Sequence, residues 1–184
     1  GIGISVILVC TVFAACTGVI GASVVAMGLL ALPMMLKYGY DKQMTCGAIC
    51  AGGTLGILIP PSIMLVVMAS EASLSVGQLF AGAVIPGLIL AALYTGYIAI
   101  RCYANPQMGP PISPEELAKV TKKQIFMMVL KSLVPPVILI LGVLGTLFAG
   151  IATPTEAAGG GAFLAFILVL AYGKFSWENL YQAV

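Results

Sequence analysis

The stretch that decides the fold is Gly52-Gly53-Thr54-Leu55-Gly56-Ile57-Leu58-Ile59-Pro60-Pro61-Ser62, in the middle of an uncharged run over residues 43–70. Two adjacent prolines remove two backbone N–H groups and clash with the preceding helical turn, so they predict an interruption. The glycines add backbone freedom that a plain spanning helix does not need. Backbone freed at membrane depth is tolerated only inside protein or beside a watery cavity. We therefore expect a discontinuous helix whose free carbonyls, with the hydroxyls of Thr54 and Ser62, face a binding site.

Composition indicates an integral membrane protein. Of 184 residues, 61% are hydrophobic and 8% are charged, whereas soluble domains carry about 25% charged residues. Strand-like alternation is missing, so the predicted fold is all-α. A net charge of +2 is too small to suggest a nucleic-acid partner. The chain has no histidine and no predicted span carries two carboxylates, so we expect no enzyme.

A second interruption is expected within residues 1–36, which carry no charge. This run is longer than the roughly 20 residues that one span needs. The stretch Thr17-Gly18-Val19-Ile20-Gly21-Ala22-Ser23 combines two glycines with two hydroxyls and is the candidate break. We expect two short limbs that form a re-entrant hairpin there. A single long tilted helix, with its small residues packed against a neighbour, is the alternative.

The rest of the chain divides at polar segments. After the broken helix at 43–70, a span is expected at 75–104. Residues 105–131 contain a polar loop and an amphipathic helix that would lie along the membrane surface. Residues 132–184 would hold two further helices joined at 151–156, and the opening of another. Since the chain starts at Gly1 and ends inside a new helix, we expect a piece of a longer protein.

Charged residues separate by side of the membrane in this topology. The side opposite the basic residues holds Glu71 and Glu156 and no Lys or Arg. Because positively charged loops stay cytoplasmic, the basic side is predicted to be cytoplasmic. The basic residues on that side are Lys37, Lys42, Arg101, Lys119, Lys122, Lys123, Lys131 and Lys174.

Glu156 has two interpretations. Thr153 or Pro154 would start a helix with Glu156 in its first turn, where the helix dipole favours an acid. The alternative is a role for Glu156 in ion coupling. The remaining chemistry is small hydroxyl residues beside backbone breaks, a set that suits Na⁺, and half-helix amino ends, which attract a carboxylate.

The chain resembles the large membrane (permease) subunit of tripartite ATP-independent periplasmic (TRAP) transporters, the DctM-like component. The similar elements occur in family order over nearly the whole chain. They are the stretch 17–23 with Met27-Gly28, Gly39-Tyr40-Asp41, the stretch 53–62, Leu79-Phe80-Ala81-Gly82, Pro86-Gly87, and Gly150-Ile151-Ala152-Thr153-Pro154-Thr155-Glu156-Ala157-Ala158.

The resemblance implies a secondary transporter with inverted repeats and an elevator-type moving domain. Residues 1–104 would then be part of the transport domain, 105–131 a cytoplasmic loop and arm helix, and 132–184 the start of a second repeat. The chain would thus hold the site elements of the first repeat. The family would place the protein in the bacterial or archaeal inner membrane as a multi-pass permease. Partners would be a small membrane subunit, a periplasmic substrate-binding protein and an organic-acid substrate.

The resemblance also implies a binding site. Gly21, Ala22 and Ser23 would form the hairpin tip, and residues 53–62 the broken helix facing it. No cofactor is expected, and Na⁺, the coupling ion, would be held by Ser23, Thr54, Ser62 and the backbone of Gly56 and Ile59. The wider set of ion- and substrate-binding candidates adds Pro60, Pro61, Thr17, Gly53, Thr153 and Glu156. Many family members have Gly-Ser-Ser at the tip, so Ala22 removes one hydroxyl here.

The predicted function is Na⁺-coupled import of organic acids delivered by the periplasmic binding protein. Two alternatives remain at this point. One is an ion-coupled carboxylate transporter that needs no binding protein. The other is a purely structural membrane subunit.

Overall fold

The computed structural model describes residues 1–110, 122–173 and 175–177. This part of the chain is helical and contains no strand, as the composition predicted. The elements are α1 (Ile2–Thr17), α2 (Ile20–Lys37), α3 (Lys42–Thr54), the 3₁₀ turn η1 (Leu55–Ile57), α4 (Ile63–Glu71), α5 (Val76–Ala104), α7 (Lys122–Phe148) and α8 (Pro154–Ala171).

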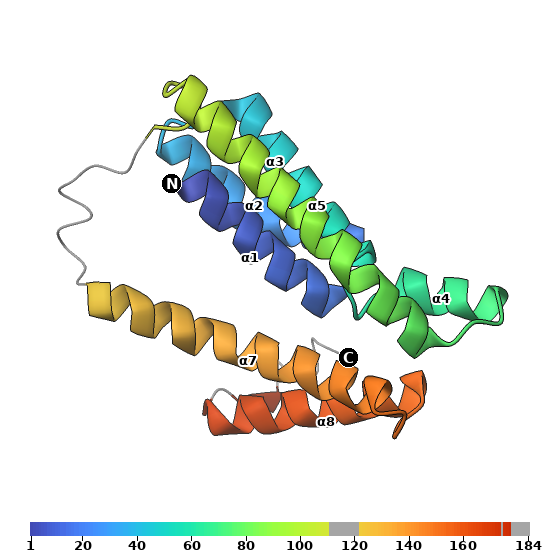
Figure 1. The fold of residues 1–184 in the computed structure, drawn as a ribbon. Helices are drawn as coiled ribbons and strands as arrows, with labels where there is room; N and C mark the ends of the chain where they lie inside the picture. The colour runs from blue at the N-terminus through green and yellow to red at the C-terminus, as the bar shows by residue number, and fades with distance from the viewer. Residues whose placement is uncertain (111–121, 174, 178–184) are drawn as a thin grey trace.

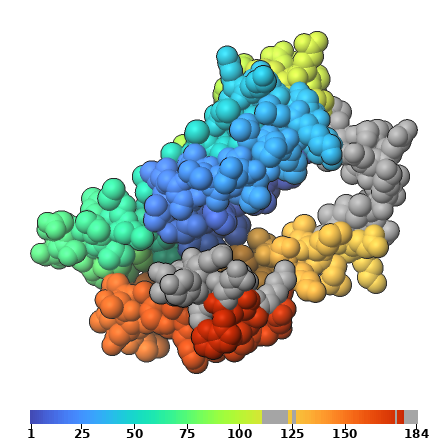
Figure 2. Space-filling view, turned by 180° about the vertical axis from the view of Figure 1, so that it is seen from behind, coloured from blue at the N-terminus to red at the C-terminus, as the bar shows by residue number. Residues whose placement is uncertain are grey.

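The helices form a packed block, α1–α5, with the pair α7 and α8 beside it (Figure 1). Buried apolar side chains of α1, α2 and α3 make the main core, among them Val6, Met35 and Ile49. A second cluster joins the pair to the block, because Phe80 of α5 packs with Leu144 of α7 and Ala157 of α8. Figure 2 shows α1 and α2 above α7 and α8 on the face behind this view.

The discontinuous helix predicted at 43–70 is present. The α3 helix ends at Thr54, η1 follows, and the chain is non-helical until Ser62 caps the start of α4. The peptide bond between Pro60 and Pro61 is cis. In Figure 1, α3 lies along α5, while α4 runs in another direction beside the first turns of α5. The two prolines therefore separate two helices of different orientation.

The expected hairpin is also present, and a single long helix at 1–36 is excluded. The chain reverses at Gly18, whose φ of 63° is left-handed, and at Val19, which is extended. The prediction that Gly21, Ala22 and Ser23 form the tip was wrong by a few residues. They lie in the first turn of α2, since the left-handed glycine already completes the reversal.

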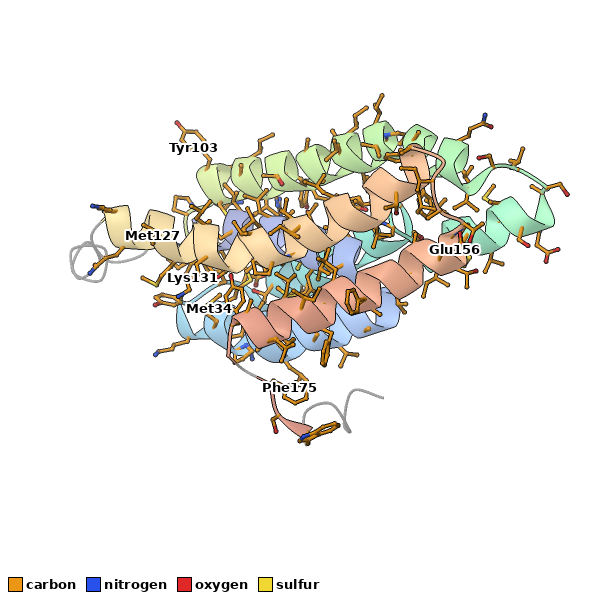
Figure 3. All side chains as sticks on the ribbon, turned by 90° about the horizontal axis from the view of Figure 1, so that it is seen from below. Met34, Tyr103, Met127, Lys131, Glu156 and Phe175 are labelled. Carbon is orange, nitrogen blue, oxygen red and sulfur yellow. The ribbon has the colours of Figure 1, made fainter. Side chains whose placement is uncertain are left out.

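Four of the described helices are long and apolar enough to cross a membrane, and the shorter α1 is apolar as well. They are α2, α5, α8 and, within α7, residues Met127–Phe148. The chain is therefore a multi-pass membrane protein. Figure 3 shows Lys131 and Glu156 toward opposite ends of the α7–α8 pair.

One predicted domain division does not coincide with a helix end. The division at 131/132 between the arm helix and the next span falls inside α7, which continues without interruption from Lys122 to Phe148. The apolar stretch beginning at Met127 extends the helix through the proposed end of the arm. The earlier part of the predicted arm, with Lys119, and the end of the chain, with Lys174 and residues 178–184, lie outside the described residues. The join predicted at 151–156 corresponds to the turn between α7 and α8.

Candidate functional site

The two helix breaks pack against each other. A methyl group added to Gly18 at the hairpin turn would lie 2.9 Å from the carbonyl oxygen of Pro61 and 3.4 Å from the Cα of Ser62. A methyl group on Gly53, near the end of α3, would collide with Val24 in α2. The hairpin turn therefore faces the proline pair, and the start of α2 faces the end of α3.

Further glycines let the backbones of the break and its neighbours approach closely. A methyl group on Gly56 would lie 3.2 Å from the carbonyl oxygen of Ala14 in α1. On the other side, one on Gly87 of α5 would lie 2.9 Å from the side chain of Ile59. Sequence reasoning did not place Gly18 or Gly87 at the site, although Gly18 lies in the predicted break. For Gly87 the Pro86-Gly87 pair was the available signal.

The hairpin turns back beside the middle of α5. Near the start of α1, Gly3 lies against Ile98, whereas Ala14 packs with Ala91 and with Leu55 of the break. The 16 residues of α1 extend about 24 Å and the 29 residues of α5 about 44 Å. The part of α5 beyond the hairpin turn is accompanied by α4 (Figure 1). The two breaks thus lie in the interior of the helical block.

Ser23 and Thr17 join the two hairpin limbs at the turn. Their hydroxyl oxygens are 2.6 Å apart, and that of Ser23 also donates to the carbonyl of Val19 at 2.8 Å. Ser23 is buried and Thr17 is half-buried. Of the other predicted tip residues, Gly21 and Ala22 are exposed, and nothing lies within 4 Å of a methyl group placed on Gly21. Of the three residues predicted to form the tip, Ser23 is therefore the one that lies at the break, where its hydroxyl contacts that of Thr17.

The proline pair frees two carbonyls in the break. In a continuous helix the N–H groups of residues 60 and 61 would bond to the carbonyls of Gly56 and Ile57, but proline has no N–H. The hydroxyl of buried Ser62 donates to the Ile57 carbonyl at 2.8 Å and also caps α4. The carbonyl of Gly56 has no such helical donor. Thr54 donates its hydroxyl to the carbonyl of Ala51 at 2.7 Å.

Helix ends supply the electrostatics of this region. The carboxyl ends of α1 and η1 carry partial negative charge, and the amino ends of α2 and α4 carry partial positive charge. These ends belong to residues 1–36 and 43–70, which contain no charged side chain. The local electrostatic field therefore comes from backbone and hydroxyl dipoles. Such oxygen atoms suit a hard monovalent cation, and the amino ends suit an anion.

Thr153 and Glu156 form hydrogen bonds with each other. The Glu156 carboxylate accepts from the N–H and the hydroxyl of Thr153, both at 2.8 Å, in a capping box at the start of α8. Both side chains are exposed. This geometry supports the interpretation of Glu156 as an acid at a helix start.

A cavity of about 420 Å³ lies beside the breaks. On one side it is lined by Thr17 and Gly18 of the hairpin turn and by Pro61 and Ser62 of the break. On the other it is lined by residues of α7 and α8, among them Pro154. The hairpin turn and the proline pair therefore line the same cavity.

Comparison with known proteins identifies the family. The family model described as "Tripartite ATP-independent periplasmic transporter, DctM component" matches residues 1–184. The C4-dicarboxylate TRAP transporter large permease protein DctM of Vibrio cholerae is 38% identical over 170 residues, covering 91% of this chain and 35% of that protein. Its counterpart in Pseudomonas aeruginosa is 37% identical over 175 residues, covering 94% of this chain and 39% of that protein.

A third relative has a different substrate in its name. The ectoine/5-hydroxyectoine TRAP transporter large permease protein UehC of Ruegeria pomeroyi is 33% identical over 184 residues, covering 99% of this chain and 41% of that protein. No solved structure matched the chain. The chain spans about two fifths or less of the length of these relatives.

Membership of a transporter family supports the expectation that the chain is no enzyme. The helical fold, the two breaks and these matches together show that the chain belongs to the family of TRAP transporter large permeases.

Proposed function

We propose that the chain is part of a Na⁺-coupled secondary transporter and that its two helix breaks hold the coupling ion beside an organic-acid substrate. The observation that supports this most directly is the contact of Gly18 at the hairpin turn with Pro61 and Ser62. It brings together freed backbone, buried hydroxyls and four helix ends in a region without charged side chains. Half-helix ends of this kind bind ions and carboxylates in secondary transporters.

The residues present fit Na⁺, which takes oxygen ligands. The hydroxyls of Ser23, Thr54 and Ser62 and the carbonyls of Gly56 and Ile59 are the proposed ligands. Each of the three hydroxyls donates its hydrogen to a backbone carbonyl. A hydroxyl oxygen that donates in this way keeps lone pairs for a cation. The oxygens of Ser23 and Ser62 each also accept one hydrogen bond, from the Thr17 hydroxyl and from the N–H of Leu65, so each would have one lone pair left for the ion.

The substrate and the partners are part of the same proposal. The amino ends of α2 and α4 would attract the carboxylate of an organic acid. Two of the relatives are named for C4-dicarboxylates, which supports this class. A periplasmic binding protein and a small membrane subunit would complete the transporter, as the family description supports. The hairpin would be re-entrant, the block α1–α5 would move in an elevator fashion, and the basic loops would face the cytoplasm of the inner-membrane protein.

The test is uptake by the full-length permease that contains this chain, reconstituted in proteoliposomes with its partners and a C4-dicarboxylate. Uptake should require an inward Na⁺ gradient. Ser23→Ala and Thr54→Val should each raise the Na⁺ concentration for half-maximal uptake about tenfold, as expected for losing about 1.4 kcal/mol of binding. Thr95→Val is the matched control, because Thr95 donates to the carbonyl of Ala91 in the same manner but outside the breaks.

Three outcomes would contradict parts of this proposal. Uptake that does not respond to Na⁺ would remove the ion from the mechanism. If Ser23→Ala, Thr54→Val and Thr95→Val all raise the Na⁺ concentration for half-maximal uptake equally, the hydroxyls stabilise their helices and do not bind the ion. Uptake without the binding protein would favour the alternative of a transporter independent of it.

A further inference from the structure

A second cavity, of about 600 Å³, lies between α3 and α5. The two helices are antiparallel along it, so that Gln43 near the start of α3 is level with Arg101 near the end of α5. At the other end, Ala51 of α3 is level with Leu90 of α5. The floor is the buried cluster of Ile7, Ala48 and Ile98, and Figure 1 shows α3 and α5 side by side. We refer to this cavity as the α3–α5 groove.

One end of the α3–α5 groove is basic. Arg101 is half-buried, and its guanidinium makes no hydrogen bond or ion pair with any described residue. Asp41 also lines this end, but its carboxylate caps α3 by accepting from the N–H of Met44 at 2.9 Å. Arg101 is therefore a cation in a partly apolar setting, without a partner among the residues that the structure describes. An anion beside it would form charge-assisted hydrogen bonds.

Neighbouring charges reinforce the basic character of this end. The Asp41 N–H donates to the carbonyl of Met108 at 3.1 Å, which ties the turn between α2 and α3 to the chain that follows α5. Lys37 and Lys42 lie on either side of that turn. Neither lysine lines the groove, but both are exposed next to the turn that carries Asp41, so the described charges on this turn and on Arg101 are three cations and one acid. The charge at this end is complementary to a phosphate.

The remainder of the groove suits a hydrocarbon chain. From Arg101 to Leu90 it follows α5 for about 16 Å, and its wall there includes Ala51, Leu90 and Leu93. Leu93 and Tyr97 are 63% and 61% exposed, so the groove is open along the outer face of α5. Because α5 is long and apolar enough to span the bilayer, an acyl chain lying against this face would be at the depth of the hydrocarbon. A small soluble anion would use only the basic end and leave the apolar length empty.

We propose that the α3–α5 groove binds one anionic phospholipid, with its phosphate on Arg101 and an acyl chain lying between α3 and α5 toward Leu90. Tyr97, one helical turn before Arg101 in α5, would then lie near the headgroup level, which aromatic rings favour. Basic pockets between membrane helices bind anionic headgroups in this way. The proposal depends on the membrane location of these helices and does not depend on Na⁺ coupling at the helix breaks.

The test is native mass spectrometry of the full-length permease in detergent, with added phosphatidylglycerol, phosphatidylcholine or glycerol 3-phosphate. The first phosphatidylglycerol adduct should be stronger than that of phosphatidylcholine, and glycerol 3-phosphate should give none. Arg101→Gln should weaken the adduct about fivefold, and Arg101→Lys should retain most of it. The matched control is Lys131→Gln, which removes an exposed cation from α7 outside the groove.

A second variant tests the apolar part without changing charge. Gly47 lines the groove, and a methyl group placed on it meets nothing within 4 Å, so Gly47→Leu fills open space. It should also weaken the first adduct, with an unchanged thermal transition. An adduct of wild-type strength in both Arg101→Gln and Gly47→Leu would overturn the proposal, as would equal binding of phosphatidylcholine. Binding of glycerol 3-phosphate alone would replace the lipid by a soluble phosphate. Should Gly47→Leu fail to fold, the comparison of Arg101→Gln with Arg101→Lys decides.

Discussion

Two of the three proline pairs in this chain, Pro60-Pro61 and Pro135-Pro136, have opposite effects on their helices. Pro60-Pro61 separates α3 from α4, whereas Pro135-Pro136 lies inside the uninterrupted α7. Each pair removes two N–H groups and frees the carbonyls four residues earlier. In each case a hydroxyl donates a hydrogen bond to one of the freed carbonyls. Ser62 donates to Ile57 at 2.8 Å, and Tyr172 of α8 donates to Lys131 at 3.1 Å.

The difference comes from the surroundings of each pair. Pro60-Pro61 follows glycines at 52, 53 and 56 that pack on α1 and α2, and a serine that caps the next helix comes directly after it. Pro135-Pro136 stands between Leu133-Val134 and Val137-Ile138, without a glycine or a cap nearby. Two prolines therefore weaken a helix in both places. Only where tertiary contacts hold the bent backbone does the helix end.

The largest expected effect tests this comparison directly. Replacing Pro60 and Pro61 together by alanine restores two N–H groups, so the helix should continue through the break and Na⁺-driven uptake should be abolished. The same replacement at Pro135 and Pro136 should leave uptake within about twofold, because α7 is already helical. The measurement is initial uptake by the full-length permease in proteoliposomes. Similar losses in both double variants would mean that the two pairs do not differ in function.

The next effect concerns the contact between the hairpin turn and the break. Gly18→Ala places a Cβ at a left-handed residue and 2.9 Å from the Pro61 carbonyl oxygen. It should destabilise the protein by about 2 kcal/mol. Gly28→Ala in α2 is the control, because nothing lies within 4 Å of the added methyl group, and it should be neutral or stabilising by up to about 1 kcal/mol. Thermal unfolding in detergent measures both, and equal transitions would show that this contact is not tight.

A smaller effect distinguishes the two hydroxyls that donate to freed carbonyls, those of Ser62 and Tyr172. Ser62→Ala removes both the donor to Ile57 and the cap of α4, and should cost about 1 kcal/mol. Tyr172→Phe removes the donor to Lys131 at an exposed site, where water replaces it, and should cost less than about 0.5 kcal/mol. Thermal unfolding of the two variants ranks them. A larger loss in Tyr172→Phe would place the more important hydroxyl in the α7–α8 pair.

The smallest expected effect on transport is at Glu156. Glu156→Gln keeps a side chain that can accept from Thr153, so α8 should remain capped and uptake should stay within about twofold of the wild type. The Na⁺ dependence of uptake should be unchanged as well. A large shift in that dependence would restore the alternative in which Glu156 takes part in coupling.

Much of the fold follows from local chemistry that can be read along the chain. The uncharged apolar runs predict membrane helices, because charged groups are costly in hydrocarbon. The break at residues 55–62 follows from missing N–H groups and from glycines, and the hairpin from a glycine that can adopt positive φ. The helix start at Thr153 follows from a capping pattern within four residues. In each case the cause lies within a few residues of its effect.

Other features depend on contacts between residues far apart in the chain. No local pattern predicts the contacts of Gly18 with Pro61 and of Gly87 with Ile59. No local pattern predicts that α7 continues through its two prolines either. The hairpin tip was misplaced for the same reason, since both Gly18 and Gly21 permit a reversal and packing selects one. Close packing distinguishes such positions by tenths of an ångström, which side-chain type alone does not encode. The two breaks are thus local in origin, and their juxtaposition is a property of the folded chain.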